Sequence, residues 1–546
     1  MIEFDLVIVG GGPTGLIAAI EAEKHGINNI LILEKEEALG GLLNQCIHTG
    51  YGKSIFGEEM TGPEFCEKLV SLIEEKNIEY KLSTFVMNID NNRIITSINS
   101  EDGVLKIKAK SIILAVGAKE RPRGSMNILG SKYAGIFTVG TAQQLANQYG
   151  ILPGKEVVIL GSRDLGMVMA RRLKLEGANV KAIIELRSYV GGIRSIYEEC
   201  IKPFDIPVMF NHTILELRGK ERLESVIVAK VKEDKKYIEG TETEIFCDTL
   251  LLSPGLEPNS ELTKNMNIKL NEVSMFPIVT DRFESSLDGV FVCGNALHIH
   301  DYMETILEEA KEAVKNSCNY VKGNYMKNKT IKITFDDSIK YTMPNSIQFP
   351  IAEDRDKIRI SFKVTEKLQN SKITIRIDDD IIKSEDASNM MPSEIETIEI
   401  DTELLRNKEI KKITLKIEEE EAKYTEGSAI DMMCQGCTLG CSIKVYERKG
   451  DVLVEGNLCK RGEQYGKTEY VKPYRTIIYK VKVRDGDFKT VPVKTDRDVM
   501  REDAYKVMKV LKQIELDAPL NIGEVVFENI ANTPVNVVST RRINKA

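Results

Sequence analysis

The glycine-rich stretch FDLVIVGGGPTG, residues 4–15, constrains the fold of this chain more than any other feature. Its apolar run from Leu6 to Val9 predicts a buried parallel strand, and glycines with the spacing G-x-G-x-x-G follow that strand. The next residues, LIAAIEAEKHG, have helix formers at helical spacing and predict a helix that Gly26 ends. Strand, glycine loop and helix in this order are typical of a dinucleotide-binding unit. The loop residues expected to bind are Gly10, Gly12, Pro13, Thr14 and Gly15.

The glycines of this loop have separate physical roles. Gly10 permits the tight turn, Gly12 lets the backbone approach a pyrophosphate, and Gly15 allows close packing of the helix on the strand. The helix N-terminus then offers free N–H groups to the phosphates. A second apolar strand, Ile30 to Leu33, ends in Glu34, which we expect to meet a ribose hydroxyl.

The same pattern occurs a second time. An apolar strand ending in Gly117 closes the first unit, and a second unit begins with a strand from Val157 to Leu160. A helix is predicted from about Leu165, and the strand Val180 to Ile184 leads to a second acid. Another apolar strand that ends in a glycine, within residues 250–258, closes this unit, so the sequence predicts two dinucleotide-binding domains. The residues expected to bind in the second domain are Gly161, Arg163, Asp164, Gly166 and Glu185.

A later stretch, residues 289–314, predicts a strand, a Cys-Gly-Asn turn and an amphipathic helix. With this element the first 320 or so residues resemble the flavoprotein family with two dinucleotide-binding domains that includes thioredoxin reductase and the glutathione reductase-like enzymes. The resemblance implies FAD in the first domain, NAD(P)H in the second, and a return of the late turn to the flavin, with the N-terminus of the following helix facing it. Asn295 stands where that family usually has Asp. The resemblance extends the expected FAD-binding residues to Glu34, Gly41, Gly117, Gly294 and Asn295.

Two features depart from the family pattern. Arg163 replaces the middle glycine of the second loop, where it could crowd the pyrophosphate or bind it through its guanidinium group. Glu185 favours NAD over NADP because a carboxylate repels a 2′-phosphate, and Arg187 close by weakens this preference. The first 330 residues contain no Cys-x-x-Cys or Cys-x4-Cys pair, which disfavours a disulfide reductase.

Candidates for a catalytic role are few. Cys46 stands alone in GGLLNQCIHTG, and we expect a buried core cysteine there rather than a redox group. His48, His298 and His300 fall in motifs that the resemblance places near the flavin, and we expect each to be a hydrogen-bonding or structural histidine rather than a catalytic base.

The runs GGLLNQCIHTGYG, MTGPEF, GSRDLGMVMARRL and CGNALHIHD are similar to a narrower branch of flavoproteins. Its members are the FAD- and NAD-binding subunits of multi-subunit dehydrogenases for proline, opines or glycerol 3-phosphate. This resemblance implies a separate flavoprotein subunit that oxidises the organic substrate, while the present chain moves electrons onward.

From about Tyr325 the composition changes. Segments such as KIRISFKV and KITIRID alternate apolar and charged residues, which predicts half-exposed antiparallel strands. We expect residues 325–426 to form a β-sandwich-like module that acts as a spacer or docking surface.

The last part of the chain gathers four of the ten cysteines, Cys434, Cys437, Cys441 and Cys459. Four thiolates at this spacing fit one [4Fe-4S] cluster or one tetrahedral zinc ion. The segment resembles the N-terminal iron-sulfur domain of molybdopterin oxidoreductases, including the later Pro473-Tyr474-Arg475, which favours the cluster. It also resembles a small uncharacterised cysteine domain that accompanies glycerol 3-phosphate dehydrogenase-like proteins in anaerobes.

These patterns predict an α/β fold with four domains: two Rossmann-like dinucleotide-binding domains, a β-rich module and a small α+β four-cysteine domain. The FAD-binding domain comprises residues 1–120 and 256–324, the NAD-binding domain 121–255, the module 325–426 and the cysteine domain 427–546. A net charge of −8 with mixed signs argues against nucleic-acid binding. No apolar run spans a membrane and no export signal precedes the first strand, so we expect a cytoplasmic protein with reduced cysteines.

The interpretation that unites these features is a redox relay. FAD, NAD and a [4Fe-4S] cluster in one chain would couple two-electron to one-electron chemistry, in a complex with a flavoprotein dehydrogenase subunit or with ferredoxin. One alternative is a free-standing NADH:acceptor oxidoreductase. Another is a non-catalytic electron-transfer scaffold with a vestigial second nucleotide site and structural zinc.

Overall fold

The structure is a computed structural model that describes residues 1–545 except 122, 127, 233, 273, 328, 379, 407–408, 420–429, 435–441, 449–450, 458–459 and 472–473. Two compact units are present. The first comprises Met1–Leu42, Cys66–Lys119 and Leu256–Tyr424, and the second comprises Leu43–Phe65, Glu120–Gly255 and Thr425–Ala546. The segment Leu43–Phe65 thus groups with the second unit, although its sequence position lies inside the range expected for the FAD-binding domain.

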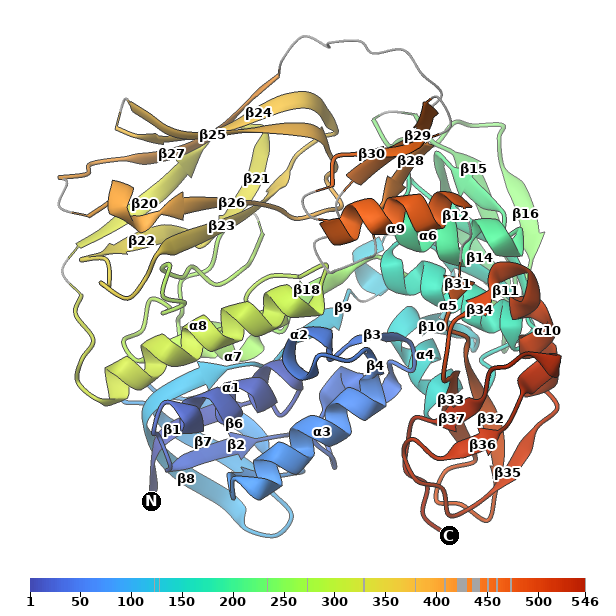
Figure 1. Cartoon of the computed structure of the whole chain (residues 1–546), viewed down its shortest axis with the longest axis horizontal. Coiled ribbons are helices and arrows are strands. Elements are labelled where there is room, and N and C mark those ends of the chain that lie inside the picture. The colour runs from blue at the N-terminus through green and yellow to red at the C-terminus, as the bar shows by residue number, and fades with distance from the viewer. Residues whose placement is uncertain are drawn as a thin grey trace. The chain divides into compact units, whose positions relative to one another are not determined.

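The first unit is built on a seven-stranded sheet with the order β5-β2-β1-β8-β7-β6, in which β19 also pairs with β8. The central strands pair in parallel, and Leu6, Val7 and Ile8 of β1 are fully buried, as the apolar run predicts. The helices α1 (Pro13–Lys24) and α8 (Met303–Val321) lie side by side in Figure 1. The strands are β1 (Ile2–Val9), β2 (Ile30–Leu33), β5 (Glu79–Lys81), β6 (Phe85–Ile89), β7 (Ile94–Asn99), β8 (Gly103–Leu114) and β19 (Val290–Val292).

A parallel five-stranded sheet with the order β10-β17-β11-β12-β13 forms the core of the second unit. It carries the repeated strand-loop-helix motif, and a three-stranded antiparallel sheet, β14-β15-β16, is inserted in the chain between its strands β13 and β17. The elements are β10 (Ile136–Thr138), α4 (Val139–Asn147), β11 (Glu156–Leu160), α5 (Asp164–Leu175), β12 (Asn179–Glu185), α6 (Arg194–Cys200), β13 (Val208–Phe210), β14 (His212–Gly219), β15 (Leu223–Lys230), β16 (Thr243–Phe246) and β17 (Thr249–Leu252).

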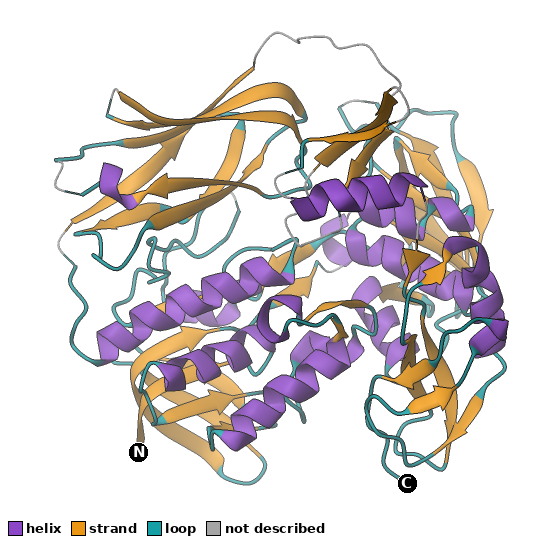
Figure 2. Ribbon diagram, in the orientation of Figure 1, coloured by secondary structure: helices purple, strands orange, loops and turns teal. Residues whose placement is uncertain are grey.

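The later part of the first unit, residues 329–419, consists mainly of strands, as Figure 2 shows. They form two sheets, β22-β20-β27-β24-β25 and β21-β23-β26, with a shared apolar core that includes Ile360, Phe362 and Ile375. The strands are β20 (Lys329–Phe335), β21 (Ile339–Met343), β22 (Ser346–Phe349), β23 (Lys357–Val364), β24 (Leu368–Ile377), β25 (Asp380–Met390), β26 (Glu396–Asp401) and β27 (Ile413–Glu419).

The C-terminal part of the second unit contains two more sheets. The strands β28 (Ile430–Met433), β29 (Ser442–Arg448) and β30 (Asp451–Glu455) form an antiparallel sheet, and α9 (Lys460–Val471) packs against β29 and β30. A five-stranded sheet follows in the order β35-β32-β33-β37-β36, with β32 at Ile478–Arg484, β33 at Thr490–Thr495, β35 at Glu515–Asp517, β36 at Val525–Phe527, β37 at Val537–Ser539 and the helix α10 at Arg501–Leu511.

The strand, turn and amphipathic helix expected within residues 289–314 are all present. The strand is β19, the turn is the short 3₁₀ element η4 (Gly294–Ala296), and the helix is α8, which begins at Met303. The intervening residues stay non-helical because their side chains and backbone bond to Asn295 and Glu309 instead. None of the helices in the described ranges is long and apolar enough to cross a membrane.

Candidate functional site

The first glycine loop has the geometry that its spacing predicts. Gly10 has a left-handed φ of +108°, and a Cβ on it would lie 2.5 Å from the Ala115 carbonyl oxygen. A Cβ on Gly15 would collide with the Gly10 carbonyl oxygen, so α1 packs tightly on β1. A Cβ on Gly12 would have no neighbouring atom within 4 Å, and no side chain caps the N-terminus of α1. The loop therefore leaves backbone N–H groups open on one side, as a pyrophosphate requires.

Glu34 follows β2 and is almost fully buried beside this loop. Its Oε2 atom accepts the backbone N–H of Gly11 at 2.6 Å, and its Oε1 atom accepts the N–H of Glu36 at 2.9 Å. Each carboxylate oxygen has a second lone pair, so Glu34 braces the loop and still has acceptor capacity for a ribose hydroxyl.

Two more expected FAD residues, Gly41 and Gly294, meet the same loop. A Cβ on Gly41 would lie 3.2 Å from the Cα atom of Gly12, and one on Gly294 would lie 2.5 Å from Thr14 Oγ1. The late turn therefore returns to the first loop within the first unit. Gly117, with a φ of +67°, has open space around it.

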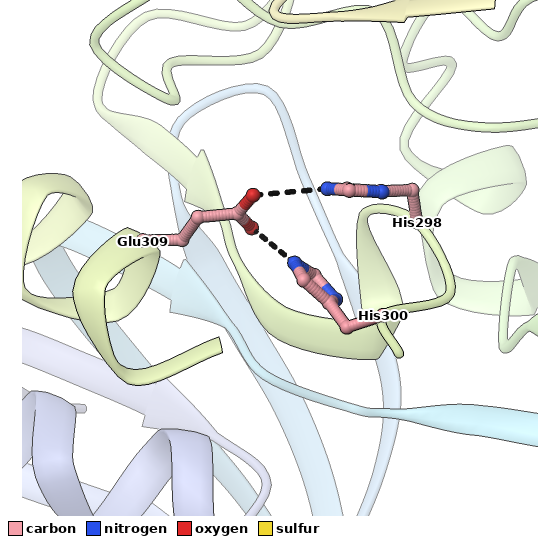
Figure 3. Close-up of side chains that lie close together, drawn as sticks. All are labelled: His298, His300 and Glu309. Carbon is pink, nitrogen blue, oxygen red and sulfur yellow. Dashed lines mark hydrogen bonds and ion pairs between the residues drawn. The ribbon is translucent and has the colours of Figure 1, made fainter. Parts of the chain in front are cut away.

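The side-chain oxygen of Asn295, in this late turn, is hydrogen-bonded to His300. Its Oδ1 atom lies 3.1 Å from both the backbone nitrogen and the Nδ1 atom of His300. Figure 3 shows the next layer, in which the two carboxylate oxygens of Glu309 contact His298 Nε2 at 2.9 Å and His300 Nε2 at 2.7 Å. The two histidines predicted from the HIHD motif are thus brought together with a carboxylate from α8 that the sequence did not indicate.

The second loop repeats the first. Gly161 has a φ of +97°, and Cβ atoms on Gly161 and Gly166 would collide with the backbone and the hydroxyl of Ser253, respectively. Arg163 is the N-cap residue of α5 and its side chain makes no capping hydrogen bond. The N–H groups at this helix end thus have no side-chain cap, as in the first loop.

Arg163 lies over the glycine that ends the closing strand. A Cβ on Gly255 would lie 3.0 Å from Arg163 Nε. Burial lowers the pKa of Arg163; the positive charges of Arg187 and Arg121 act in the same direction, and the negative charges of Asp164 and Glu185 oppose them.

Both carboxylate oxygens of Glu185 accept hydrogen bonds from nearby residues of the chain. Its Oε2 atom accepts the backbone N–H and the hydroxyl of Ser162, and its Oε1 atom accepts the backbone N–H of Arg187 at 3.0 Å. The Ser162 hydroxyl oxygen in turn accepts the N–H of Gly191 at 2.7 Å. Asp164 accepts the N–H of Ile193 at 2.6 Å, so two acids tie the segment after β12 to the glycine loop.

Sequence reasoning missed Ser162, Gly191 and Gly192 as parts of this site. A Cβ on Gly192 would collide with Asp164 Oδ1, and one on Gly191 would lie 2.9 Å from Arg187 Nη1. The available signal was the pair Gly191-Gly192 shortly after the acid that ends β12.

Cys46 is half-buried rather than a core residue, which corrects the expectation for it. Its thiol is hydrogen-bonded with His48, Tyr51 and Gln143. Burial raises the pKa of Cys46, but these hydrogen bonds and the charge of His48 outweigh burial and lower it, while the pKa of His48 is raised by the same pairing against its own burial. His48 Nδ1 donates to the Thr49 carbonyl at 2.8 Å, and its Nε2 atom, which lies 3.4 Å from the Tyr51 hydroxyl, remains for the thiol.

Of the four clustered cysteines, Cys434 is described, and Cys437, Cys441 and Cys459 lie outside the described residues. Cys434 is buried against Ile443 and Val445. A Cβ on Gly462, in the first turn of α9, would lie 3.4 Å from Cys434 Sγ. The sulfur atom thus lies beside the helix that starts directly after position 459.

Two protein families together match most of the chain. Residues 4–317 match the family described as pyridine nucleotide-disulphide oxidoreductase, and residues 460–541 match a family described only as a protein of unknown function, DUF1667. The second match begins one residue after Cys459 and so includes none of the four cysteines.

Among curated relatives, the hydrogen cyanide synthase subunit HcnB of Pseudomonas protegens is 25% identical over 287 residues, which are 48% of this chain and 59% of that protein. A ferredoxin–NADP reductase of Streptococcus thermophilus is 26% identical over 342 residues, 58% of this chain and 93% of that enzyme. The sarcosine oxidase subunit alpha of a Corynebacterium species is 25% identical over 315 residues, 54% of this chain and 31% of that subunit. The thioredoxin reductase structure from T. acidophilum covers 59% of this chain and 99% of its own, at 22% identity and a TM-score of 0.49.

Proposed function

The chain belongs to the pyridine nucleotide-disulphide oxidoreductase family and is an FAD-dependent NAD(P)H oxidoreductase, and we propose that it relays electrons between NAD(H) and a partner protein through a cysteine-bound centre. The observation that carries this proposal is the duplicated loop, Gly10–Gly15 with Glu34 and Gly161–Gly166 with Glu185. Bound FAD exchanges a hydride with a nicotinamide and single electrons with a one-electron acceptor.

The task of the protein in this reaction is to bind and to orient. The open N-terminus of α1 and Gly12 would hold the FAD pyrophosphate, Glu34 the ribose, and Gly41, Gly117, Gly294 and Asn295 the remainder. The uncapped N-terminus of α5 would hold the phosphates of the nicotinamide nucleotide, and Arg163 would bind them as a cation.

NAD is the proposed nicotinamide substrate. Glu185 brings a negative charge to the end of β12, where a 2′-phosphate would lie. The Nη1 atom of Arg187 lies 3.3 Å from Glu185 Oε1, and its positive charge offsets part of the carboxylate's negative charge.

For the cysteine domain we propose a [4Fe-4S] cluster at Cys434, Cys437, Cys441 and Cys459, with zinc as the alternative occupant. The buried Cys434 thiol beside the first turn of α9 supports a site at this position. Zinc has no redox chemistry, so only the cluster would make the chain a relay.

The proposed partner is a flavoprotein dehydrogenase subunit, as in complexes that oxidise glycerol 3-phosphate, proline or opines. Two relatives that carry the name of a complex subunit, HcnB and the sarcosine oxidase subunit alpha, support a hetero-complex. We place the complex in the cytoplasm.

Anaerobic mixing with NADH or NADPH tests the proposal. Purified protein reconstituted with FAD should lose its flavin absorbance faster with NADH, and Ser substitution of Cys459 should leave that step unchanged while it abolishes transfer to the partner. Protein that takes up no FAD would refute the proposal. Zinc without iron in protein handled without oxygen would refute the relay.

Two other functions are distinguishable. A free-standing NADH:ferredoxin oxidoreductase is favoured by the similarity to a ferredoxin–NADP reductase, and would reduce ferredoxin without a partner subunit. A non-catalytic scaffold is favoured by Arg163 in place of a glycine, and would be indicated if neither nucleotide reduced the flavin while Arg163→Gly restored the reaction.

A further inference from the structure

Residues 43–65, which we call the Cys46 loop, have little regular structure of their own. The loop contains the short strands β3 (Thr49–Tyr51) and β4 (Met60–Thr61), the single helical turn α2 (Lys53–Phe56) and the first residues of α3 (Gly62–Glu75). Elements this short are not stable alone, so the loop needs partners outside itself to keep one conformation. The loop and the C-terminal residues 425–546 belong to the same compact unit.

Three consecutive carbonyl groups of the Cys46 loop accept hydrogen bonds from three different parts of the unit. The donors are Arg541 Nη2 to the Asn44 carbonyl, Asn147 Nδ2 to the Gln45 carbonyl at 2.9 Å, and the Gly62 backbone nitrogen to the Cys46 carbonyl at 2.9 Å. The backbone at Cys46 is therefore fixed from the C-terminal region, from the end of α4 and from the start of α3. Only the first of these donors carries a charge.

An ion pair joins the other end of the loop to the C-terminal region. Lys494 Nζ lies 3.1 Å from Glu64 Oε2, and the two side chains are 18% and 11% exposed. The same carboxylate oxygen accepts the backbone N–H and the hydroxyl of Thr61 at 2.8 and 2.9 Å. Because the pair is largely withdrawn from water, salt screens it less than a surface ion pair.

Both cations are carried by the five-stranded sheet β35-β32-β33-β37-β36, which we call the C-terminal sheet. Lys494 lies in β33, and Arg541 is the second residue after β37. Ser539 Oγ donates to the Arg541 carbonyl at 2.8 Å, and the backbone N–H of Thr540 donates to the Pro492 carbonyl at 2.9 Å. The backbone that carries the Arg541 guanidinium group is thus held on the sheet.

The C-terminal sheet is itself docked on α4 and α5 through β32. Lys480, which is 9% exposed, donates to the carbonyl of Ala146 in the last turn of α4. The guanidinium carbon of Arg172 in α5 lies 5.2 Å from the centroid of the Tyr479 ring. The next residue of α4, Asn147, is the one that bonds to the Cys46 loop, so the end of this helix contacts both the sheet and the loop.

Strand alternation shows that the lysine-bearing face of this sheet is an interface. Val481 and Val491 lie in the apolar core that the sheet shares with α10. Lys480 and Lys494 occupy the alternate positions of β32 and β33 and so lie on the opposite face. Burying a lysine is costly unless its ammonium group meets an acceptor, and both lysines meet one outside the sheet.

We propose that the C-terminal sheet positions the Cys46 loop against α4, with Arg541 and Lys494 as the positioning residues. Both residues lie within the match to DUF1667, so this proposal gives a role to a family described only as a protein of unknown function. The segment that it holds carries the Cys46 thiol and His48. The proposal requires neither bound FAD nor bound nicotinamide nucleotide.

Helix α4 alone is the alternative support for the loop. It contacts the loop through Asn147 and through Gln143, which is hydrogen-bonded with Cys46. If these contacts sufficed, removing a cation from the C-terminal sheet would leave the loop unchanged.

Amide hydrogen exchange of the full-length protein tests the proposal. The amides of Cys46 and Gly62 donate within the loop at 3.2 and 2.9 Å and report on its opening. Arg541→Ala and Lys494→Met should each speed exchange in residues 43–65 about tenfold, because each removes a hydrogen bond from a charged donor. Arg541→Lys, which keeps a charged donor, should stay within about threefold of the wild type. Arg497→Ala is the matched control, since Arg497 is an exposed arginine of the same region.

A charge exchange keeps the test decisive if Arg541→Ala fails to fold. Lys494→Glu should speed exchange in the loop more than Lys494→Met, because it places two carboxylates together. Adding Glu64→Lys to Lys494→Glu should recover at least about threefold of the lost protection.

The ring nitrogens of His48 give a readout inside the loop. The chain has five histidines, so selective ¹⁵N-histidine labelling gives few signals, and His48→Gln identifies those of His48. Arg541→Ala should shift the His48 signals, because His48 Nδ1 bonds to a carbonyl of the same loop. The signals of His212 in β14 of the same unit should stay in place, which a general loss of stability would not allow.

Unchanged exchange in both Arg541→Ala and Lys494→Met would overturn the proposal and leave the loop to α4. Equal acceleration in Arg497→Ala, or an acceleration that Arg541→Lys shares, would also overturn it. Neither measurement uses the flavin or NADH, so failure of the proposed redox function would leave this result standing, and failure here would leave that function untouched.

Discussion

Ser162 donates both its backbone N–H and its hydroxyl to one oxygen of Glu185, at 2.9 and 2.5 Å. The same hydroxyl oxygen accepts the N–H of Gly191, so a single side chain joins the glycine loop, the acid and the following segment. The acid is thereby held at the end of β12 in one orientation, so a ribose at the proposed nucleotide site would meet an acceptor that is already ordered.

Ser162→Ala should therefore weaken NADH binding. The variant keeps the backbone hydrogen bond and loses two that involve the hydroxyl, so we expect the KM for NADH to rise about fivefold to fiftyfold with little change in FAD content. Steady-state kinetics and the flavin-to-protein ratio measure both. Ser253→Ala is a useful comparison, since its hydroxyl lies near Gly166 and makes no contact with the acid in the described structure. An unchanged KM in Ser162→Ala would show that Glu185 does not meet the nucleotide.

Cys46 should react as a thiolate. Because its pKa is lowered by pairing with His48, its alkylation rate by iodoacetamide should rise less steeply between pH 7 and 9 than that of an ordinary thiol, which gains about tenfold per pH unit below its pKa. Cys247 provides an internal control, since burial raises its pKa to about 12. Mass spectrometry of peptides quantifies both sites in one sample.

His48→Gln should restore ordinary behaviour to Cys46, because the amide can donate a hydrogen bond but carries no charge. The rate at pH 7 should fall at least severalfold and acquire a steeper pH dependence. Equal rates in the variant and the wild type would show that His48 does not activate the thiol.

The glycine loops were predicted from sequence because strand, loop and helix follow one another at a fixed spacing. A Cβ on Gly15 would collide with the Gly10 carbonyl oxygen within the same loop, whereas Gly10, Gly161 and Gly166 face Ala115 and Ser253, which directly follow β8 and β17. Glu309 and Gln143 could not be found this way. Glu309 contacts His300 from the middle of α8, and Gln143 contacts Cys46 from the middle of α4. Both residue types also suit an exposed helix face, so only tertiary packing shows that these two side chains point inward. The turn at Asn295 was predicted, but the start of α8 at Met303 was not, because the bonds of His298 and His300 to Asn295 and Glu309 depend on tertiary packing.

Glu396, at the start of β26, should make stability depend on pH. Burial, followed by the charges of Glu394 and Asp301, raises its pKa to about 7. A carboxyl whose pKa is raised on folding contributes stability that is full below its unfolded pKa and is lost as pH rises through the folded value. Glu396→Gln should therefore gain stability relative to the wild type between pH 5 and pH 8, on the order of 2 kcal/mol. Thermal unfolding at both pH values measures the difference, and a pH-independent difference would contradict the raised pKa.

Lys480 predicts the opposite dependence in the second unit. This buried lysine of β32 donates to the Ala146 carbonyl at the end of α4 and lies 3.6 Å from Glu176, yet burial, with the nearby Arg172 charge, lowers its pKa to about 8. A base with a lowered folded pKa binds fewer protons when folded than when unfolded, between pH 8 and its ordinary pKa of 10.5. Stability should therefore rise with pH across that window relative to Lys480→Met, by on the order of 2 kcal/mol. Lys482→Met, at an exposed position two residues along the same strand, is the matched control. Thermal midpoints of the three proteins at pH 7.5 and 10 decide the matter, and parallel changes in all three would exclude a titrating Lys480.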